Sequence, residues 1–238
     1  MKYFIVHAHH EPKSFNGALT RAAAEALPEH GHEVVVSDLH AMGFDAVSDR
    51  DNFTTVADPG YLKQQQEEMF ASEHDGFAPD ILAEMEKLDC CDALVFQFPL
   101  WWFGLPAILK GWVDRVFAMG RVYGGRRWYE HGVFAGKRAM VSLTTGGGPN
   151  FYAADGLNGD LEMILFPINH GMLRFTGFDV VPPFVAWSPA RVGDEERAAY
   201  LEAYVARLLD IQNIQPIAYP ALDDYDPKTF RLKSGGTG

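Results

Sequence analysis

The stretch LVFQFPLWWFGLP, residues 94–106, decides the fold of this chain. Residues 94–98 form a short, mostly apolar run, which is typical of a strand buried on both faces, and Pro106 suits the first turn of a helix. The turn between them carries three aromatic side chains, on Trp101, Trp102 and Phe103. Such turns lie at the surface and, in an open parallel sheet, line the ligand site. The stretch therefore predicts an α/β sheet with a flat aromatic ligand at this turn, and an aromatic dimer contact is the alternative.

Strands and helices alternate on both sides of this stretch. We expect strands at residues 3–8, 33–37, 93–98, 137–145 and 178–185, and helices at 14–26, 79–88, 107–117 and 194–211. This alternation predicts one domain, residues 1–211, built on a doubly wound parallel sheet of about five strands. Residues 40–76 form a long insertion in which Gln64 to Glu68 have the pattern of a solvated helix face. Residues 212–238 predict an extended C-terminal arm with a frayed end.

The composition argues against several classes of function. The formal charge of −12 at pH 7 repels nucleic acid and anionic membranes, because no basic patch offsets it. The only two cysteines, Cys90 and Cys91, are adjacent, so they suit neither a disulfide framework nor a metal cage. The sequence shows neither the apolar core of a signal peptide nor an apolar span that suits a bilayer. We therefore expect a cytoplasmic protein with reduced thiols, no nucleic-acid partner and no membrane insertion.

Two further turns carry ligand-binding features. Ser14 is a suitable N-cap for the first helix, and the backbone N–H groups at a helix start, together with the Asn16 side chain, can hold a phosphate. Gly146, Gly147 and Gly148 directly follow a buried strand. Glycines let the backbone approach a ligand closely and point successive N–H groups at it. Both turns are predicted to lie at the same edge of the sheet as the aromatic turn.

Ordered motifs along the chain resemble those of the flavin-dependent NAD(P)H:quinone oxidoreductases. They are Ala8-His9 with Ser14-Phe15-Asn16, Ser37-Asp38-Leu39, Phe96-Gln97-Phe98-Pro99-Leu100, Trp102-Phe103-Gly104 with residues 106–112, and Thr144-Thr145-Gly146-Gly147. The resemblance runs from the first strand to at least Arg197. It implies a flavodoxin-like fold and a homodimer in which both subunits complete the pocket. It also implies two-electron reduction of a quinone by NAD(P)H or another dihydronicotinamide through FAD, with ping-pong kinetics and FMN as the alternative flavin.

The resemblance assigns roles to individual residues. The flavin contacts that it implies are His9, Ser14, Phe15, Asn16, Pro99, Leu100, Trp101, Trp102, Phe103, Thr144, Thr145, Gly146, Gly147, Tyr152 and Arg197. Tyr152, by its match to the family's catalytic tyrosine, would hydrogen-bond the flavin as charge develops. The pocket shared by nicotinamide and quinone would consist of Trp102, Phe103, Gly146, Gly147, Phe151 and Phe178.

Two departures from the family's pattern limit this transfer. Type 1 quinone reductases carry a histidine six residues after the tyrosine. This chain has Asn158 at that position, and type 2 enzymes also have an asparagine there. An amide side chain, unlike a histidine, cannot change its protonation state at neutral pH. The choice among NADH, NADPH and a smaller dihydronicotinamide therefore stays open. Type 2 enzymes also bind a metal through two histidines and a tail cysteine. His170 matches the first histidine, but Arg174 replaces the second and the tail has no cysteine, so we predict no metal.

Two alternatives to the enzyme stay open. Relatives of the fold accompany potassium-efflux systems as flavin-binding regulatory subunits, and others are one-electron flavodoxin-like carriers. The Trp102-Phe103 turn and the extra length of the chain argue against a carrier, because they indicate a pocket large enough for a substrate.

Overall fold

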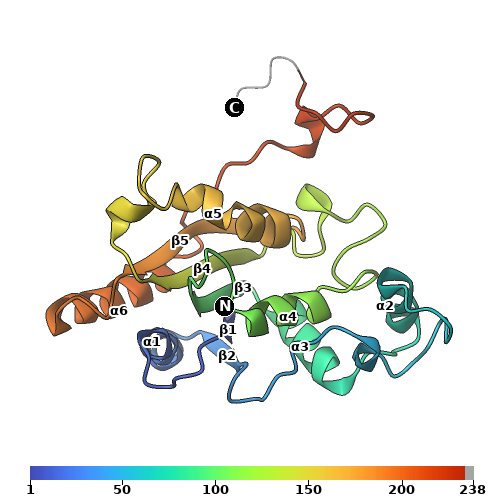
Figure 1. The fold of residues 1–238 in the computed structure, drawn as a ribbon, viewed down its shortest axis with the longest axis horizontal. Coiled ribbons are helices and arrows are strands. Elements are labelled where there is room, and N and C mark those ends of the chain that lie inside the picture. Colours follow the sequence, from blue (N-terminus) through green and yellow to red (C-terminus); the bar gives the residue numbers. More distant parts are fainter. Residues whose placement is uncertain (234–238) are drawn as a thin grey trace.

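The structure, a computed structural model that describes residues 1–233, is built on a five-stranded sheet with helices on both faces (Figure 1). The strands are β1 (Lys2–His7), β2 (Glu33–Asp38), β3 (Ala93–Pro99), β4 (Arg138–Thr145) and β5 (Asp179–Trp187). They lie in the order β2-β1-β3-β4-β5, and every neighbouring pair is parallel. The predicted doubly wound, flavodoxin-like sheet of five strands is therefore confirmed.

The helices form a layer on each face of the sheet. Consecutive side chains of a strand point to opposite faces, so both faces of the central strands need cover. Tyr3 and Ile5 pack with Leu19 of α1 (Phe15–Glu29) and Leu208 of α6 (Asp194–Leu209). On the other face, Phe4, Phe96 and their neighbours pack against α3 (Pro79–Cys90), α4 (Ala107–Val116) and α5 (Leu161–Ile168). No helix within residues 1–233 is long and apolar enough to cross a membrane.

Shorter elements occupy the connections. They are α2 (Gln64–Glu73), the 3-10 helices η1 (Arg50–Asn52), η2 (Tyr129–His131), η3 (Pro149–Tyr152) and η5 (Leu222–Asp224), and the π-helical turn η4 (Asn169–Arg174). The expected solvated helix face at Gln64 to Glu68 is wrong for Glu67 and Glu68, which expose only 2% and 5% of their surface. The Glu67 carboxylate accepts from the N–H groups of Ala57 and Asp58, and Glu68 accepts from that of Met119. Backbone donors of two loops thus offset the cost of burying these carboxylates, one loop just before α2 and the other after α4.

The outer edge of β5 is closed along its middle. Pro182 and Pro183 lie within the strand and have no N–H group to donate. The carbonyl of Val180 accepts from the N–H of Ile217 at 2.8 Å, and that of Pro182 accepts from Nη2 of Arg207. Beyond Ile217 the arm rises away from the sheet (Figure 1). The frayed end predicted from the sequence concerns residues 234–238, which lie outside the described residues.

Candidate functional site

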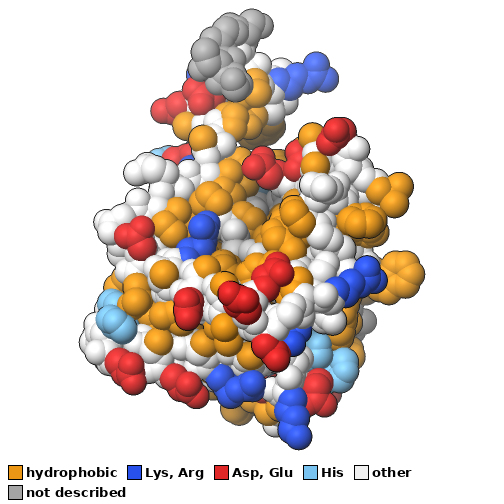
Figure 2. All heavy atoms as spheres, turned by 90° about the vertical axis from the view of Figure 1, so that its left-hand side faces the viewer, with side chains coloured by type: hydrophobic (Ala, Val, Ile, Leu, Met, Phe, Trp, Pro, Cys, Tyr) orange, Lys and Arg blue, Asp and Glu red, His pale blue; other side chains and the backbone are white. Residues whose placement is uncertain are grey.

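A cavity of about 790 Å³ lies where the carboxyl ends of β1, β3 and β4 meet the start of α6. β1 and β3 are neighbours, but the helices that follow them, α1 and α4, cover opposite faces, so the two connecting turns diverge and open a crevice. The cavity is lined by His9, Lys13, Ser14, Phe15, Asn16, Ala18, Pro99, Leu100, Trp101, Trp102, Thr144, Thr145, Gly146, Tyr152, Pro189, Ala190 and Arg197. Hydrophobic side chains gather on this side of the molecule, with acidic side chains among them (Figure 2).

The aromatic turn at the cavity has an unusual backbone. Trp102 and Phe103 have φ angles of 51° and 59°, in the left-handed region that side chains other than glycine's rarely adopt. The turn is held because the N–H of Gly104 donates to the carbonyl of Trp101, and the N–H of Leu100 donates to that of Thr144. The Trp102 side chain is 97% exposed. Strain of this kind concentrates at ligand sites, and an exposed indole gains from a ligand that covers it.

The other end of the cavity is suited to an anion. Oγ of Ser14 accepts from the N–H of Gly17, which caps α1, and the first N–H groups of a helix have no acceptor within it. Lys13 and Arg197 bring two positive charges to the same cavity. Arg197 also donates to the carbonyls of Pro189 and Val192, so its position is fixed by the loop that precedes α6.

Two histidines at the end of β1 stand in different surroundings. His7 is buried, with Nδ1 2.9 Å from Oγ1 of Thr20, and burial lowers its pKa to about 4. His9 lines the cavity and packs its ring on those of His10 and Trp101. Partial burial, followed by the neighbouring His10, lowers the pKa of His9 as well. The imidazole of His7 is therefore uncharged at neutral pH. Lys13 and Arg197 are the lysine and arginine side chains that line the cavity.

The structure gathers most of the predicted site residues, but not all of them. Phe103, Gly147, Phe151 and Asn158 do not line the cavity; they lie in the turn after β3 and in the loop after β4. The sequence analysis missed Lys13, Ala18, Pro189 and Ala190, which do line it. The last two follow the carboxyl end of β5, and the same rule that located the other turns could have indicated them.

The assignment of Phe178 to the pocket is corrected by the structure. Phe178 precedes β5, at the amino end of that strand, whereas the cavity lies at the carboxyl ends. Its side chain is fully buried and stacks on the ring of Phe134, with the ring centroids 4.6 Å apart. A nine-residue strand is roughly 30 Å long, so the two positions are far apart.

Phe178 and Phe151 are expected to respond differently to truncation. Phe178→Ala should lower the free energy of unfolding by about 3–5 kcal/mol, because it leaves a cavity beside Phe134. Phe151 is 45% exposed, so Phe151→Ala should cost less than about 1 kcal/mol. Urea denaturation of the two variants tests this difference. Unchanged stability together with weaker substrate binding in Phe178→Ala would place the ring in the pocket after all.

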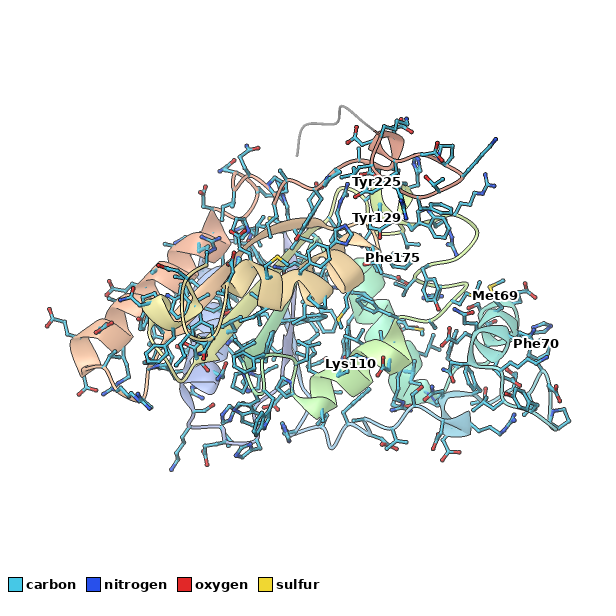
Figure 3. All side chains as sticks on the ribbon, turned by 45° about the horizontal axis from the view of Figure 1, so that its top comes forward. Met69, Phe70, Lys110, Tyr129, Phe175 and Tyr225 are labelled. Carbon is cyan, nitrogen blue, oxygen red and sulfur yellow. The ribbon has the colours of Figure 1, made fainter. Side chains whose placement is uncertain are left out.

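A second cavity, of about 770 Å³, lies between the C-terminal arm, the loop before β4 and η4. Tyr225 of the arm, Tyr129 of the loop and Phe175 follow one another from the arm toward the body of the molecule (Figure 3). Arg174 pairs with Glu130, whose Oε2 also accepts from the N–H of Leu222 at 3.3 Å. The Glu130 carboxylate thus joins the loop both to η4, through Arg174, and to the arm, through Leu222. Within residues 1–233, no group of three or more His, Cys, Asp or Glu side chains is arranged to hold a metal ion.

Comparisons with known proteins agree with this geometry. The family model described as Flavodoxin-like fold matches residues 1–210. Ribosyldihydronicotinamide dehydrogenase [quinone] of Homo sapiens is 41% identical over 217 residues, which cover 91% of this chain and 94% of the relative. NAD(P)H dehydrogenase [quinone] 1 of Rattus norvegicus is 40% identical over 223 residues, which cover 93% and 81%.

A solved structure supports the same assignment. The structure of a protein assigned as a quinone reductase of Klebsiella pneumoniae superposes with a TM-score of 0.95 at 38% identity, and covers 100% of this chain and 97% of its own. The superposition thus includes the arm as well as the sheet and its helices. This chain therefore belongs to the flavodoxin-like family of the NAD(P)H dehydrogenases (quinone) and ribosyldihydronicotinamide dehydrogenases.

Proposed function

We propose that this protein is a flavin-dependent oxidoreductase that reduces quinones by two electrons at the expense of a dihydronicotinamide. The observation that carries the proposal is the cavity at the carboxyl ends of the strands, with an aromatic turn on one side and Thr144 to Gly146 on the other. Its volume of about 790 Å³ is within the range of cofactor sites. The family to which the chain belongs includes quinone-reducing dehydrogenases.

The residues present fit a flavin. The ring system would lie between Pro99 to Trp102 and Thr144 to Gly146, and its phosphates would lie at the start of α1 with Lys13 and Arg197. The anion-binding end suits the phosphate of FMN as well as the pyrophosphate of FAD. We propose FAD, the flavin that the resemblance to the quinone oxidoreductases implies. When bound, the flavin supplies the two-electron chemistry, and the protein supplies binding and orientation.

The chain's own residues have distinct parts in this proposal. Tyr152 lines the cavity and is mostly buried, and its O–H group would donate to the flavin as negative charge develops. Trp102, Phe103, Gly146, Gly147 and Phe151 would contact the nicotinamide and then the quinone, on one face of the ring. Asn158 can donate a hydrogen bond but cannot take up a proton at neutral pH. Release of the first product before the second substrate binds gives ping-pong kinetics.

We also propose that the protein acts as a homodimer in the cytoplasm. Several large apolar side chains are exposed around the cavity and on α5, among them Trp102, Leu157 and Met163. A second copy would cover part of this surface. The aromatic residues around the second cavity, such as Tyr129 and Tyr225, would then complete the substrate pocket of the other subunit.

One preparation tests the proposal. We expect purified protein to be yellow, to release FAD on heating, and to have the mass of a dimer in solution. It should oxidise NADH, NADPH or dihydronicotinamide riboside only when a quinone is added, with parallel lines in double-reciprocal plots. Turnover with NADPH equal to or better than that with the riboside would reject a donor preference of the type 2 kind. A flavin that accumulates in a one-electron-reduced form, without quinone turnover, would support a carrier instead.

A further inference from the structure

A row of buried amide and hydroxyl groups runs beneath α1 to the wall of the first cavity. Nε2 of Gln97, on β3, donates to Oδ1 of Asn16, on α1, at 2.9 Å. Nδ2 of Asn16 donates in turn to Oγ1 of Thr144, on β4, also at 2.9 Å. Gln97 is fully buried, and the other two residues are nearly so. Asn16 and Thr144 line the cavity, whereas Gln97 lies behind them.

The direction of these hydrogen bonds determines what Thr144 offers to a ligand. A threonine hydroxyl has one proton to donate and two lone pairs that accept. Oγ1 of Thr144 accepts from Asn16, and within residues 1–233 it donates to no protein acceptor. Its proton is therefore available to a ligand, and the hydroxyl presents a donor to the cavity.

Gln97 sets this direction. If the Asn16 amide were turned over, its oxygen would accept the Thr144 proton, and the cavity would meet only hydroxyl lone pairs. The observed orientation of Asn16 requires a donor behind it, and the NH2 group of Gln97 is that donor. Among the described residues 1–233, Oε1 of Gln97 has no hydrogen-bond partner. Turning Gln97 over would leave its NH2 group without an acceptor instead, and buried N–H groups are orphaned more rarely than carbonyl oxygens.

We propose that Gln97 is a positioning residue which, through Asn16, fixes the Thr144 hydroxyl as a hydrogen-bond donor to an acceptor atom of the bound flavin. The proposal rests on the proposed function, because it requires a flavin in the cavity. Gln97 is also the single polar side chain in β3, whose other residues are apolar. An apolar residue would pack there without the cost of burying an amide, so packing alone does not account for Gln97.

Two substitutions that keep the shape of the side chain test the proposal. Thr144→Val removes the donor and should raise the flavin dissociation constant about three- to tenfold. It should also shift the two-electron midpoint potential of the bound flavin. In Gln97→Glu the ionised carboxylate can only accept, so Asn16 turns over and takes the Thr144 proton. This variant should match Thr144→Val at high pH and return toward the wild type at low pH, where the protonated carboxyl can donate again.

A double substitution and a matched control make the test specific. In a Thr144→Val background there is no hydroxyl left to direct, so adding Gln97→Glu should not change flavin affinity further. Ser142 is the control, because it is a buried polar residue opposite Gln97 on β4 that neither lines the cavity nor hydrogen-bonds to Gln97, Asn16 or Thr144 within residues 1–233. Ser142→Ala should leave the flavin affinity and the midpoint potential unchanged.

Several outcomes would overturn the proposal. One is a Gln97→Glu variant with a lowered unfolding midpoint that binds flavin as the wild type does at every pH, and another is an effect of Gln97→Glu that adds fully to that of Thr144→Val. If Gln97→Glu does not fold, Gln97→Met removes the donor at similar volume, and the effect of Thr144→Val should then shrink; an undiminished effect contradicts the proposal. Wild-type protein that binds no flavin would overturn the proposed function and this proposal together.

Discussion

Glu84→Ala is expected to lower the free energy of unfolding by about 3–5 kcal/mol. Glu84 lies on α3 and is fully buried. Its Oε2 accepts from Nε1 of Trp112, on α4, at 2.9 Å, and its Oε1 accepts from Oγ of Ser37, on β2, at 3.0 Å and from Nζ of Lys87. One carboxylate thus joins two helices and a strand. Its removal leaves a buried indole N–H and a buried hydroxyl without an acceptor, and a partly buried ammonium without its counter-charge.

The neighbouring Glu86 provides the control for this prediction. It lies on the same helix, carries the same charge and is exposed to solvent. Glu86→Ala should change the free energy of unfolding by less than about 0.5 kcal/mol. Urea denaturation monitored by far-UV circular dichroism measures both variants. Equal midpoints for the two would mean that the Glu84 network contributes nothing to stability.

Arg197→Met is expected to raise the flavin dissociation constant about 10- to 100-fold. The estimate follows from the loss of hydrogen bonds between a guanidinium and a phosphate, which are worth about 1.5–3 kcal/mol. Arg197 reaches the cavity from the first turn of α6, where Pro189, Val192 and Asp194 hold its guanidinium. The affinity of the wild type should also fall with salt more steeply than that of the variant, because one phosphate contact is electrostatic.

Arg191→Met separates this effect from a general change of charge. Arg191 lies in the loop that precedes α6, is exposed and does not line the cavity. Titration of flavin fluorescence at two salt concentrations should show a wild-type dissociation constant for Arg191→Met. A comparable loss in both variants would mean that Arg197 acts through net charge, and a loss in neither would place the phosphates elsewhere.

The five strands could be predicted because buried parallel strands appear in the sequence as apolar runs. Residues 93–99 and 138–145 are buried almost throughout, and each ends at a turn with glycine or aromatic residues. Since the carboxyl ends of parallel strands meet at one edge, three separate turns predicted one cavity. These predictions need only local pattern and the geometry of a sheet.

The predictions that failed depend on contacts between distant residues. Glu67 has the local pattern of an exposed helix residue, and only the backbone of residues 57 and 58 explains its burial. Phe178 is a phenylalanine next to a strand, and the sequence does not show which end of the sheet it faces. The hydrogen bond between Gln97 and Asn16 joins residues 81 positions apart. This hydrogen bond depends on how α1 packs on the sheet, which no local sequence pattern specifies.

The closed edge of β5 also restricts how molecules of this protein can associate. A free edge strand offers a row of N–H and C=O groups on which a strand of another molecule can add. Along β5 the two prolines withhold donors, while Ile217 and Arg207 occupy acceptors. Sheet-to-sheet extension across this edge, which leads to fibrous aggregates, is therefore blocked in the folded protein. Cleavage of the chain before Ile217 would free the Val180 carbonyl, so that this edge could pair with a strand of another molecule.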